Sequence, residues 1–325
     1  MRRKLLSGLV AAVALATAPV ASAANGGLTP VAPHSPNAHH TVTAYWVIMG
    51  FTAAIFVLVE GLLVLFVVKY RGKREDRALE GVQVHGHTRL ELIWTVIPVL
   101  ILCVIGIVVF VQLPKITDAP AATNPLRVTV EGHQFYWEFT YPNGAHTIND
   151  LYVPVGRVVD LKVISADVIH SWWIPALGGK IQAIPGITNH TWFRADKAGT
   201  YAGNCAELCG LYHANMVGHV IATSESAYTQ ELTAVSTTGL GRAEFTGVCA
   251  TCHGMTGQGG YGPAISSSPL VAQASTLVQI LRNGLDTPRP GVMPAVGNTW
   301  TKNQIDALVA YVKKNVYKGA TSGGG

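Results

Sequence analysis

Two long apolar segments constrain the fold of this chain more than any other feature of its sequence. They run from Tyr45 to Val68 and from Leu92 to Leu113, and each exceeds the roughly 20 residues that an α-helix needs to cross a bilayer. A polar segment, 69–91, separates them. The sequence therefore predicts a transmembrane hairpin of two helices, 45–68 and 92–113, in contact with membrane lipid.

The charges beside these segments predict the orientation of the hairpin. The loop 69–91 contains K-Y-R-G-K-R-E-D-R and Arg89, whereas residues 24–44 contain no Lys or Arg. The positive-inside rule places such a loop in the cytoplasm and both chain ends outside. The formal net charge of +5 is thus partly a topology signal, and we predict no nucleic-acid partner.

The first 23 residues have the pattern of a secretory signal peptide. Arg2, Arg3 and Lys4 precede an apolar stretch, and Ala21-Ser22-Ala23 resembles a cleavage site. We therefore expect a signal peptide over 1–23, followed by an extracytoplasmic segment over 24–44.

The segment 125–222 is typical of β-structure. L-R-V-T-V and F-Y-W-E-F-T-Y alternate apolar and polar residues, and Asn143-Gly144 is a strong hairpin signal. Short strands with turn signals over about 100 residues predict a β-sandwich or barrel. The Ser- and Thr-rich segment 223–239 follows, and we expect it to be a flexible linker.

A dense group of metal-binding residue types lies near the end of this β-segment. Cys205 to Met216 reads C-A-E-L-C-G-L-Y-H-A-N-M, and thiolate, imidazole and thioether ligands together favour copper. One copper ion would need only one Cys, so Cys209 offers a bridging thiolate for a second ion, with His170 upstream as a further imidazole. The alternatives are a structural zinc site or a disulfide loop, but zinc sites seldom use Met.

A second cofactor motif follows at C-A-T-C-H. Cys249 and Cys252 would attach a c-type haem through thioethers, and His253 would be its proximal ligand. Met293, in G-V-M-P, can reach the opposite face, and His/Met ligation is typical of electron-transfer haems. Met255 is the rival ligand, but it lies too close to His253 in sequence to cross the ring.

The segment 240–318 is long enough only for a small helical domain with haem in its core. N-Q-I-D-A-L-V-A-Y-V-K-K has the apolar spacing of a C-terminal helix. We expect the last residues, 319–325, to be disordered.

The two motifs, with the helix pattern L-E-L-I-W-T-V-I-P from Leu90 to Pro98, resemble subunit II of haem–copper cytochrome c oxidases. The fused haem segment resembles the caa-type enzymes of bacteria. The resemblance implies a multidomain fold: a two-helix transmembrane hairpin, an all-β cupredoxin-like sandwich and a small all-α class I cytochrome c domain. It places the chain in the bacterial inner membrane, with both metal domains on the periplasmic side.

The resemblance also implies a function and partners. The chain would be the electron-entry subunit, passing electrons from a donor through covalent haem c to the dinuclear copper centre CuA. The haem–copper centre of subunit I would then reduce oxygen to water, and subunit III would belong to the same complex. A cytochrome bc complex or a cytochrome c would be the donor. The alternative is a membrane-anchored copper and haem electron carrier, or a copper-assembly factor, without an oxidase core.

The family pattern assigns roles to individual residues. Both cysteines would bridge the coppers, and the remaining ligands would be His170, His213, Met216 and the backbone carbonyl of Glu207. The Glu207 side chain would also help bind a magnesium ion at the interface with subunit I. The carbonyl of Pro263 would orient His253.

Two further assignments carry open alternatives. Glu91 would lie at the cytoplasmic mouth of a proton channel in subunit I, or it is a solvated interfacial carboxylate. Phe135, Tyr136 and Trp137 follow G-H-Q, where family members that accept electrons from free cytochrome c have a tryptophan. They are candidates for electron entry, or they pack in the sandwich.

Overall fold

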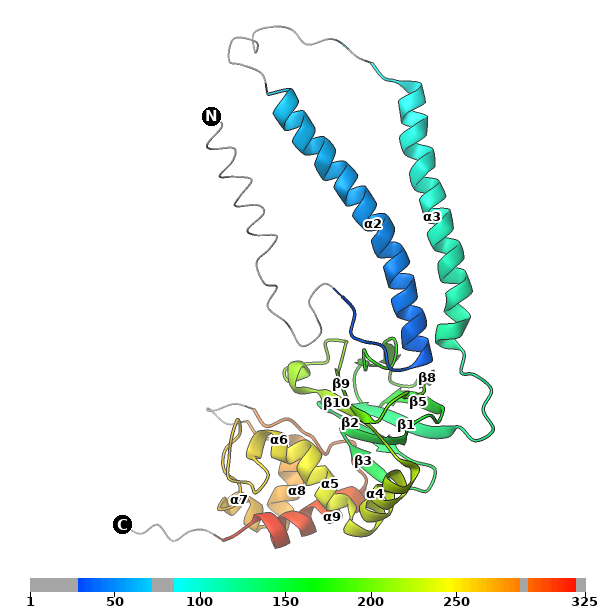
Figure 1. Ribbon diagram of the computed structural model, residues 1–325. Coiled ribbons are helices and arrows are strands. Elements are labelled where there is room, and N and C mark those ends of the chain that lie inside the picture. Colours follow the sequence, from blue (N-terminus) through cyan, green and yellow to red (C-terminus); the bar gives the residue numbers. More distant parts are fainter. Residues whose placement is uncertain (1–28, 72–82, 84, 287–291, 320–325) are drawn as a thin grey trace, which may run out of the picture.

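A computed structural model describes residues 29–71, 83, 85–286 and 292–319 (Figure 1). The predicted signal peptide 1–23, most of the predicted loop 69–91 and most of the predicted tail 319–325 lie outside the described residues. The described residues form two long helices, a β-sandwich and a small helical domain, which confirms the predicted three-part fold class.

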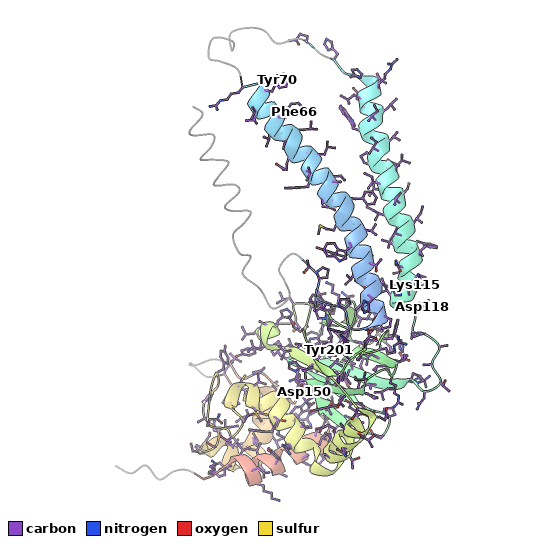
Figure 2. The ribbon with its side chains drawn as sticks, in the orientation of Figure 1. Phe66, Tyr70, Lys115, Asp118, Asp150 and Tyr201 are labelled. Atoms are coloured by element: carbon purple, nitrogen blue, oxygen red, sulfur yellow. The ribbon has the colours of Figure 1, made fainter. Side chains whose placement is uncertain are left out.

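Both apolar segments lie within helices that are longer than the segments themselves. They are α2 (Pro36–Lys69) and α3 (Thr88–Thr117). Each is long and apolar enough to cross a membrane, and the most apolar window of each has no residue buried against the rest of the described chain. Figure 2 shows Tyr70 at the end of α2 remote from the β-sandwich and Lys115 at the end of α3 beside it.

The first turn of α2 is anchored in the β-sandwich, which explains why the helix begins before the apolar segment. Asn37 is 2 % exposed, and its side-chain amide donates to the Trp192 carbonyl at 2.7 Å. The Ser35 hydroxyl accepts from the backbone N–H of Arg194 at 3.1 Å. The hairpin is therefore fixed to the sandwich by buried hydrogen bonds at its base.

The sandwich consists of two main sheets and a small ribbon. The first sheet has the order β3-β2-β1-β5-β8, the second β4-β10-β9, and the ribbon pairs β6 with β7. The strands are β1 (Leu126–His133), β2 (Tyr136–Thr140), β3 (His146–Ile148), β4 (Asp150–Pro154), β5 (Val159–Ser165), β6 (His170–Trp172), β7 (Ile181–Ala183), β8 (Asn189–Phe193), β9 (Gly199–Asn204) and β10 (Val217–Thr223).

The two main sheets enclose one apolar core. Val130 of β1 lies opposite Phe139 of β2 and beside Val163 of β5. All three are fully buried together with Leu151 and Val220 from the second sheet. The predicted hairpin turn is present, with Gly144 at φ 79°, a conformation that glycine adopts without steric cost.

The expectation of a flexible linker over 223–239 is wrong. Helix α4 (Glu225–Thr238) fills this segment and begins at Ser224, whose hydroxyl accepts from the Ala227 N–H at 3.3 Å. Tyr228 and Leu232, one helical turn apart, are buried in the core of the sandwich. The Ser- and Thr-rich composition concealed this apolar stripe.

The C-terminal domain is helical, as predicted. Its helices are α5 (Leu240–Glu244), α6 (Ala250–His253), α7 (Pro269–Ala272), α8 (Ala274–Asn283) and α9 (Lys302–Tyr311), with a π-helical turn before α6 and another after α9. A capping box of Thr301 and Gln304 starts α9. Gly241 of α5 allows close packing, because a Cβ there would lie 2.1 Å from the Ala307 carbonyl oxygen of α9.

The helical domain packs directly on the sandwich (Figure 1). Tyr136 of β2 is 1 % exposed and belongs to the apolar core of the helical domain, where its hydroxyl accepts from the indole N–H of Trp300. The Asn149 amide donates to the Gly247 carbonyl at 2.7 Å. The two domains are therefore joined by a buried interface in addition to α4.

Candidate copper centre and haem pocket

Three strand ends position the copper-ligand candidates. His170 is the first residue of β6, Cys205 directly follows β9, and Met216 directly precedes β10. His170 and Met216 have no exposed surface, and Cys205 and Cys209 are each 4 % exposed. These side chains are part of the sandwich core, which excludes water from the space between them.

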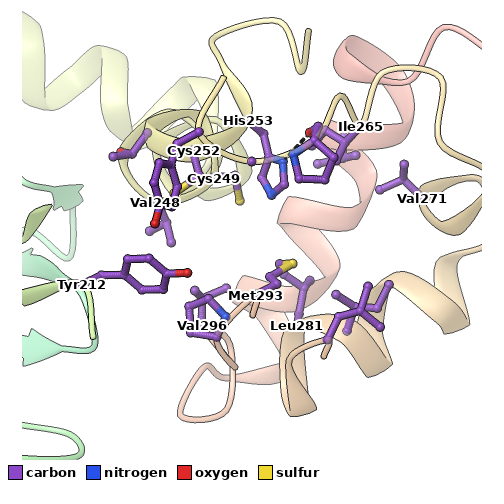
Figure 3. A pocket seen from close by; sticks show the side chains of 18 of the residues that line it. Tyr212, Val248, Cys249, Cys252, His253, Ile265, Val271, Leu281, Met293 and Val296 are labelled. Atoms are coloured by element: carbon purple, nitrogen blue, oxygen red, sulfur yellow. Dashed lines mark hydrogen bonds between the residues drawn. The ribbon is translucent and has the colours of Figure 1, made fainter. Parts of the chain in front are cut away.

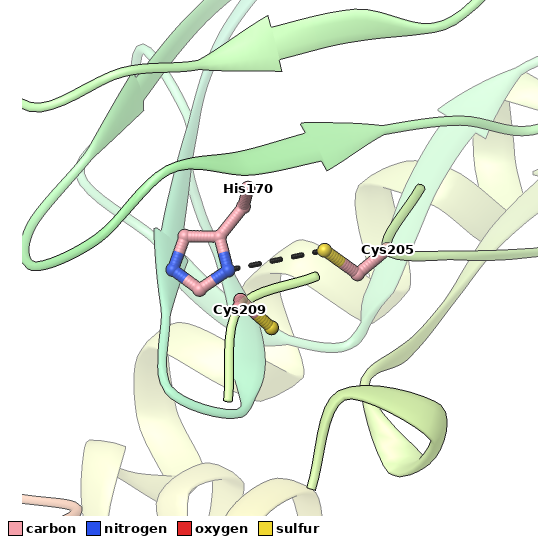
Figure 4. A group of neighbouring side chains, drawn as sticks. All are labelled: His170, Cys205 and Cys209. Carbon is pink, nitrogen blue, oxygen red and sulfur yellow. Dashed lines mark hydrogen bonds between the residues drawn. The ribbon is translucent and has the colours of Figure 1, made fainter. Parts of the chain in front are cut away.

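The ligand atoms converge on one point. The Cys205 Sγ lies 3.9 Å from His170 Nδ1, and the donor atoms of His170, Cys205 and Cys209 all lie within 4.8 Å of one another (Figure 4). The structure therefore brings one imidazole and both thiols together, although they are separated by up to 39 positions in the sequence.

Of the other candidates, His213 and Met216 lie beside Cys209, and Glu207 lies beside Cys205. The Cys209 Sγ lies 3.5 Å from His213 Nδ1 and 3.8 Å from the Met216 sulfur. The backbone carbonyl of Glu207 lies 3.2 Å from the Cys205 Sγ. All six predicted ligand residues thus lie at one site.

Asp167 orients the site from outside the ligand set. Its carboxylate accepts from His170 Nε2 at 2.8 Å and from the Gln134 backbone N–H at 2.7 Å. Nε2 is therefore the protonated nitrogen, and the Nδ1 lone pair faces the thiols. Sequence reasoning missed Asp167. Its position three residues before His170, in A-D-V-I-H, was the available signal.

Gly132 is needed for this arrangement. A Cβ at this residue would lie 2.8 Å from Cδ2 of His170, so only glycine lets β1 pass this close to the ring.

The two thiols differ in acidity. Burial opposes ionisation of Cys205, but its hydrogen bond to His170 and those to nearby backbone groups outweigh burial and lower its pKa to about 7. Burial and the neighbouring Cys205 raise the pKa of Cys209 to about 12. Both can be thiolates together only beside compensating positive charge, which a bound cation supplies. Two thiolates, two imidazoles and a thioether fit copper.

A cavity of about 360 Å³ lies in the helical domain, between its helices and the sandwich. Cys249, Cys252 and His253 lie on one side and Met293 on the other (Figure 3). Most of the remaining lining is aliphatic, including Leu281 and other core residues. An apolar slot with two thiols on its wall and ligands on opposite sides fits a covalently attached haem.

The predicted role of Pro263 agrees with the geometry of the pocket. His253 Nδ1 lies 2.7 Å from the Pro263 carbonyl oxygen. A carbonyl only accepts, so Nδ1 carries the proton and the lone pair of Nε2 is free to bind iron. Met255 is 64 % exposed and does not line the cavity, so its position does not favour it over Met293.

The three aromatic candidates for electron entry are buried to different extents. Trp137 and Tyr136 are 0 % and 1 % exposed and do not form a surface for an external donor. Trp137 packs edge-on against His170, with ring centroids 5.9 Å apart. Phe135 is half-buried and packs against Tyr212 of the segment 205–216, the copper loop, with ring centroids 5.4 Å apart. The docked helical domain explains the burial of Tyr136.

Glu91 lies at the opposite end of α3 from the copper site. Its carboxylate accepts from the His87 N–H at 2.9 Å, closing the first turn of the helix. The Glu207 carboxylate lies 3.5 Å from the side-chain amide of Gln182.

Family comparisons agree with this architecture. Residues 24–111 match the model "Cytochrome C oxidase subunit II, transmembrane domain", and 145–223 match "Cytochrome C oxidase subunit II, periplasmic domain". Residues 236–312 match "Cytochrome C oxidase, cbb3-type, subunit III". Cytochrome c oxidase subunit 2 of Alkalihalophilus pseudofirmus is 33 % identical over 310 residues, covering 88 % of this chain and 90 % of the relative. The chain belongs to the cytochrome c oxidase subunit II family.

Other family members share parts of this chain. Quinol oxidase subunit 2 of Bacillus subtilis is 34 % identical over 201 residues, covering 60 % of this chain and 63 % of the relative. The crystal structure of the periplasmic domain of subunit II of cytochrome oxidase from Bradyrhizobium japonicum is 33 % identical. It covers 37 % of this chain and 98 % of that domain, with a TM-score of 0.35.

Proposed function

We propose that this subunit II is the electron-entry subunit of a bacterial respiratory cytochrome c oxidase. The observation that carries the proposal is the position of the two sites. Phe135 and Val217 of the sandwich, and Tyr212 of the copper loop, line the same cavity as Cys252 and His253. The candidate copper centre and the haem pocket thus lie side by side, which supports electron transfer between them.

Bound at these sites, haem c and CuA supply one-electron chemistry that links a donor to the haem–copper centre of subunit I. The residues of the chain hold and shield the cofactors. Asp167 fixes the tautomer of His170, the Pro263 carbonyl fixes that of His253, and burial of both thiols keeps water from their sulfur atoms. Preorganisation of this kind limits rearrangement when the charge of a site changes.

The backbone carbonyl and the side-chain carboxylate of Glu207 have separate roles in this proposal. Its carbonyl faces the Cys205 sulfur at 3.2 Å, while its carboxylate extends towards Gln182. The carboxylate is an oxygen ligand of the type that magnesium prefers. It would join subunit II to subunit I through a magnesium ion, and subunit III and a cytochrome bc complex or cytochrome c donor complete the proposed partners.

Purification of the detergent-solubilised complex tests the proposal against its alternatives. An oxidase subunit co-purifies with a much larger multi-helix protein and has both copper and covalent haem c. A mixed-valence copper signal would appear in electron paramagnetic resonance spectra. An electron carrier or assembly factor would purify without the partner, and the 90 % coverage of an oxidase subunit favours the first outcome.

Glu91 is proposed as a proton-entry residue at the cytoplasmic end of α3. Glu91→Ala should slow steady-state oxygen consumption several-fold, while metal content and reduction of the copper centre stay normal, because the residue lies across the membrane from that centre. Turnover equal to wild type at every pH would leave Glu91 as a helix-capping carboxylate.

A further inference from the structure

Tyr212 lies between the two cofactor sites and belongs to both. It directly precedes the copper-ligand candidate His213 in the chain. Its side chain also lines the haem pocket and points into it from the sandwich (Figure 3). The copper loop, 205–216, therefore forms part of the wall of the other site, through Tyr212 and Asn215.

The Tyr212 hydroxyl holds the segment that contains the distal haem-ligand candidate. It donates to the Val292 carbonyl at 2.8 Å, and Val292 directly precedes Met293. On its other side, the Met293 N–H and carbonyl exchange two hydrogen bonds of 2.9 Å with Leu285, beyond the end of α8. Met293 is thus held by its own domain and, through Val292, by the copper loop.

The Tyr212 ring is fixed by aromatic neighbours from both domains. It packs edge-on against Phe135 at 5.4 Å and against Tyr261 at 5.9 Å between ring centroids. The copper loop packs closely on the same Phe135 ring, since a Cβ at Gly210 would lie 3.1 Å from it. A displacement of the copper loop would therefore move Tyr212 and pull on Val292.

We propose that Tyr212 is a positioning residue that couples the copper loop to the Met293 segment, so that the occupancy of the copper site alters how firmly Met293 is held. The coupling rests on the proposed function in that both sites take their metals. Coupling between two sites is reciprocal, so haem ligation would also influence the copper loop. Other contacts between the domains, such as Asn149 with Gly247, come from outside the copper loop and keep the domains together when Tyr212 is changed.

Imidazole binding to the ferric haem measures how firmly Met293 is held. Imidazole competes with a methionine ligand for iron, and its apparent affinity rises with the fraction of protein in which the methionine is released. The titration is followed by absorbance on the full chain in detergent, with the copper site either loaded or depleted by a chelator. The readout is independent of oxidase turnover.

Tyr212→Phe removes the hydroxyl and keeps the ring. A single hydrogen bond contributes about 0.5–1.5 kcal/mol, so the copper-loaded variant should bind imidazole about two- to tenfold more tightly than wild type. In the wild type, copper depletion should also tighten imidazole binding. In Tyr212→Phe this copper effect should be largely lost, because the link between the segments is absent.

Two further variants complete the test. Tyr311→Phe removes a hydroxyl from a tyrosine that packs on Phe245 within the helical domain and should behave like wild type. Tyr212→Leu removes the ring as well and should slow flash-induced electron transfer from haem to copper more than Tyr212→Phe does.

Equal imidazole affinity in Tyr212→Phe and wild type, or an undiminished copper effect in the variant, would overturn the proposal. A wild-type chain that loads both metals but transfers no electrons between them would instead refute the proposed function.

Discussion

The copper site and the haem pocket differ in what fills the space between their ligand candidates. Four of the six copper-ligand candidates, His170, Cys205, Cys209 and Met216, are buried in the sandwich, where the Asp167 carboxylate orients His170. The haem ligands instead face each other across a cavity of about 360 Å³. The core of the sandwich is therefore made of protein side chains, whereas a haem would form the centre of the core of the helical domain.

The two domains also differ in how their buried glutamates are paired. Glu138 of the sandwich is paired: it contacts His146 at 2.9 Å and the Gln304 amide at 3.3 Å. Burial opposes ionisation, but these partners and His133 outweigh burial and lower the pKa of Glu138. Glu244 of the helical domain is 1 % exposed, and neither carboxylate oxygen has a hydrogen-bond partner among the described residues. Burial and the nearby Glu138 raise the pKa of Glu244 to about 9.

Loss of haem attachment should have the largest effect on the fold. In Cys249→Ser/Cys252→Ser the unfilled cavity would cost on the order of 9 kcal/mol, at roughly 24 cal/mol per Å³ for the 360 Å³. That is comparable with the whole stability of a small domain. Residues 240–318 should therefore become susceptible to proteases, while the sandwich keeps its copper spectrum.

Cys103→Ser is the matched control, because Cys103 lies in α3 and is far from both sites. It should retain haem, copper and protease resistance. A haem-free double variant that resists proteolysis as well as wild type would show that the helical domain is preorganised too, and the contrast between the domains would be lost.

Exchange of the two buried glutamates for glutamine should have smaller effects of opposite sign. The Glu244 pKa is raised in the fold, so an unfolded chain ionises first and stability falls as pH rises from about 4.5 to about 9. At 1.4 kcal/mol per pH unit, Glu244→Gln should gain about 3 kcal/mol over wild type between pH 4.5 and pH 7.

Glu138→Gln sharpens this comparison. The Glu138 pKa is lowered, so its contribution to stability is present above the unfolded pKa and is lost as pH falls. The variant should therefore be less stable than wild type at neutral pH. Thermal melting followed by haem absorbance, at several pH values, measures both. A Glu244→Gln variant with the same pH dependence as wild type would mean that Glu244 is hydrated or paired in solution.

The ligand candidates could be predicted from the sequence, but the residues that position them could not. Cys205, Cys209 and His213 were recognisable because metal chemistry fixes residue type and spacing within one loop. Asp167 and Tyr212 act through contacts that depend on how strands and domains pack, and Tyr212 reaches a residue 80 positions away. Helix α4 was not predicted because its Ser- and Thr-rich composition is typical of a linker. In the structure, α4 packs on the sandwich through the buried side chains of Tyr228 and Leu232.

Loss of one copper thiolate should have the smallest effect on the fold. Cys209→Ser should abolish the mixed-valence copper signal, because a hydroxyl does not replace a bridging thiolate, and at most one copper should remain. The copper-depleted sandwich should change in stability by only about 1–2 kcal/mol, the usual range for a modest core substitution, because the buried side chains around Cys209 still pack against one another. Copper analysis, electron paramagnetic resonance and denaturant unfolding of the copper-depleted chain measure these effects.

Retention of two coppers and a delocalised spectrum would contradict the bridging assignment. Unfolding of the sandwich would instead show that the copper site, like the haem pocket, is part of a core that its cofactor completes.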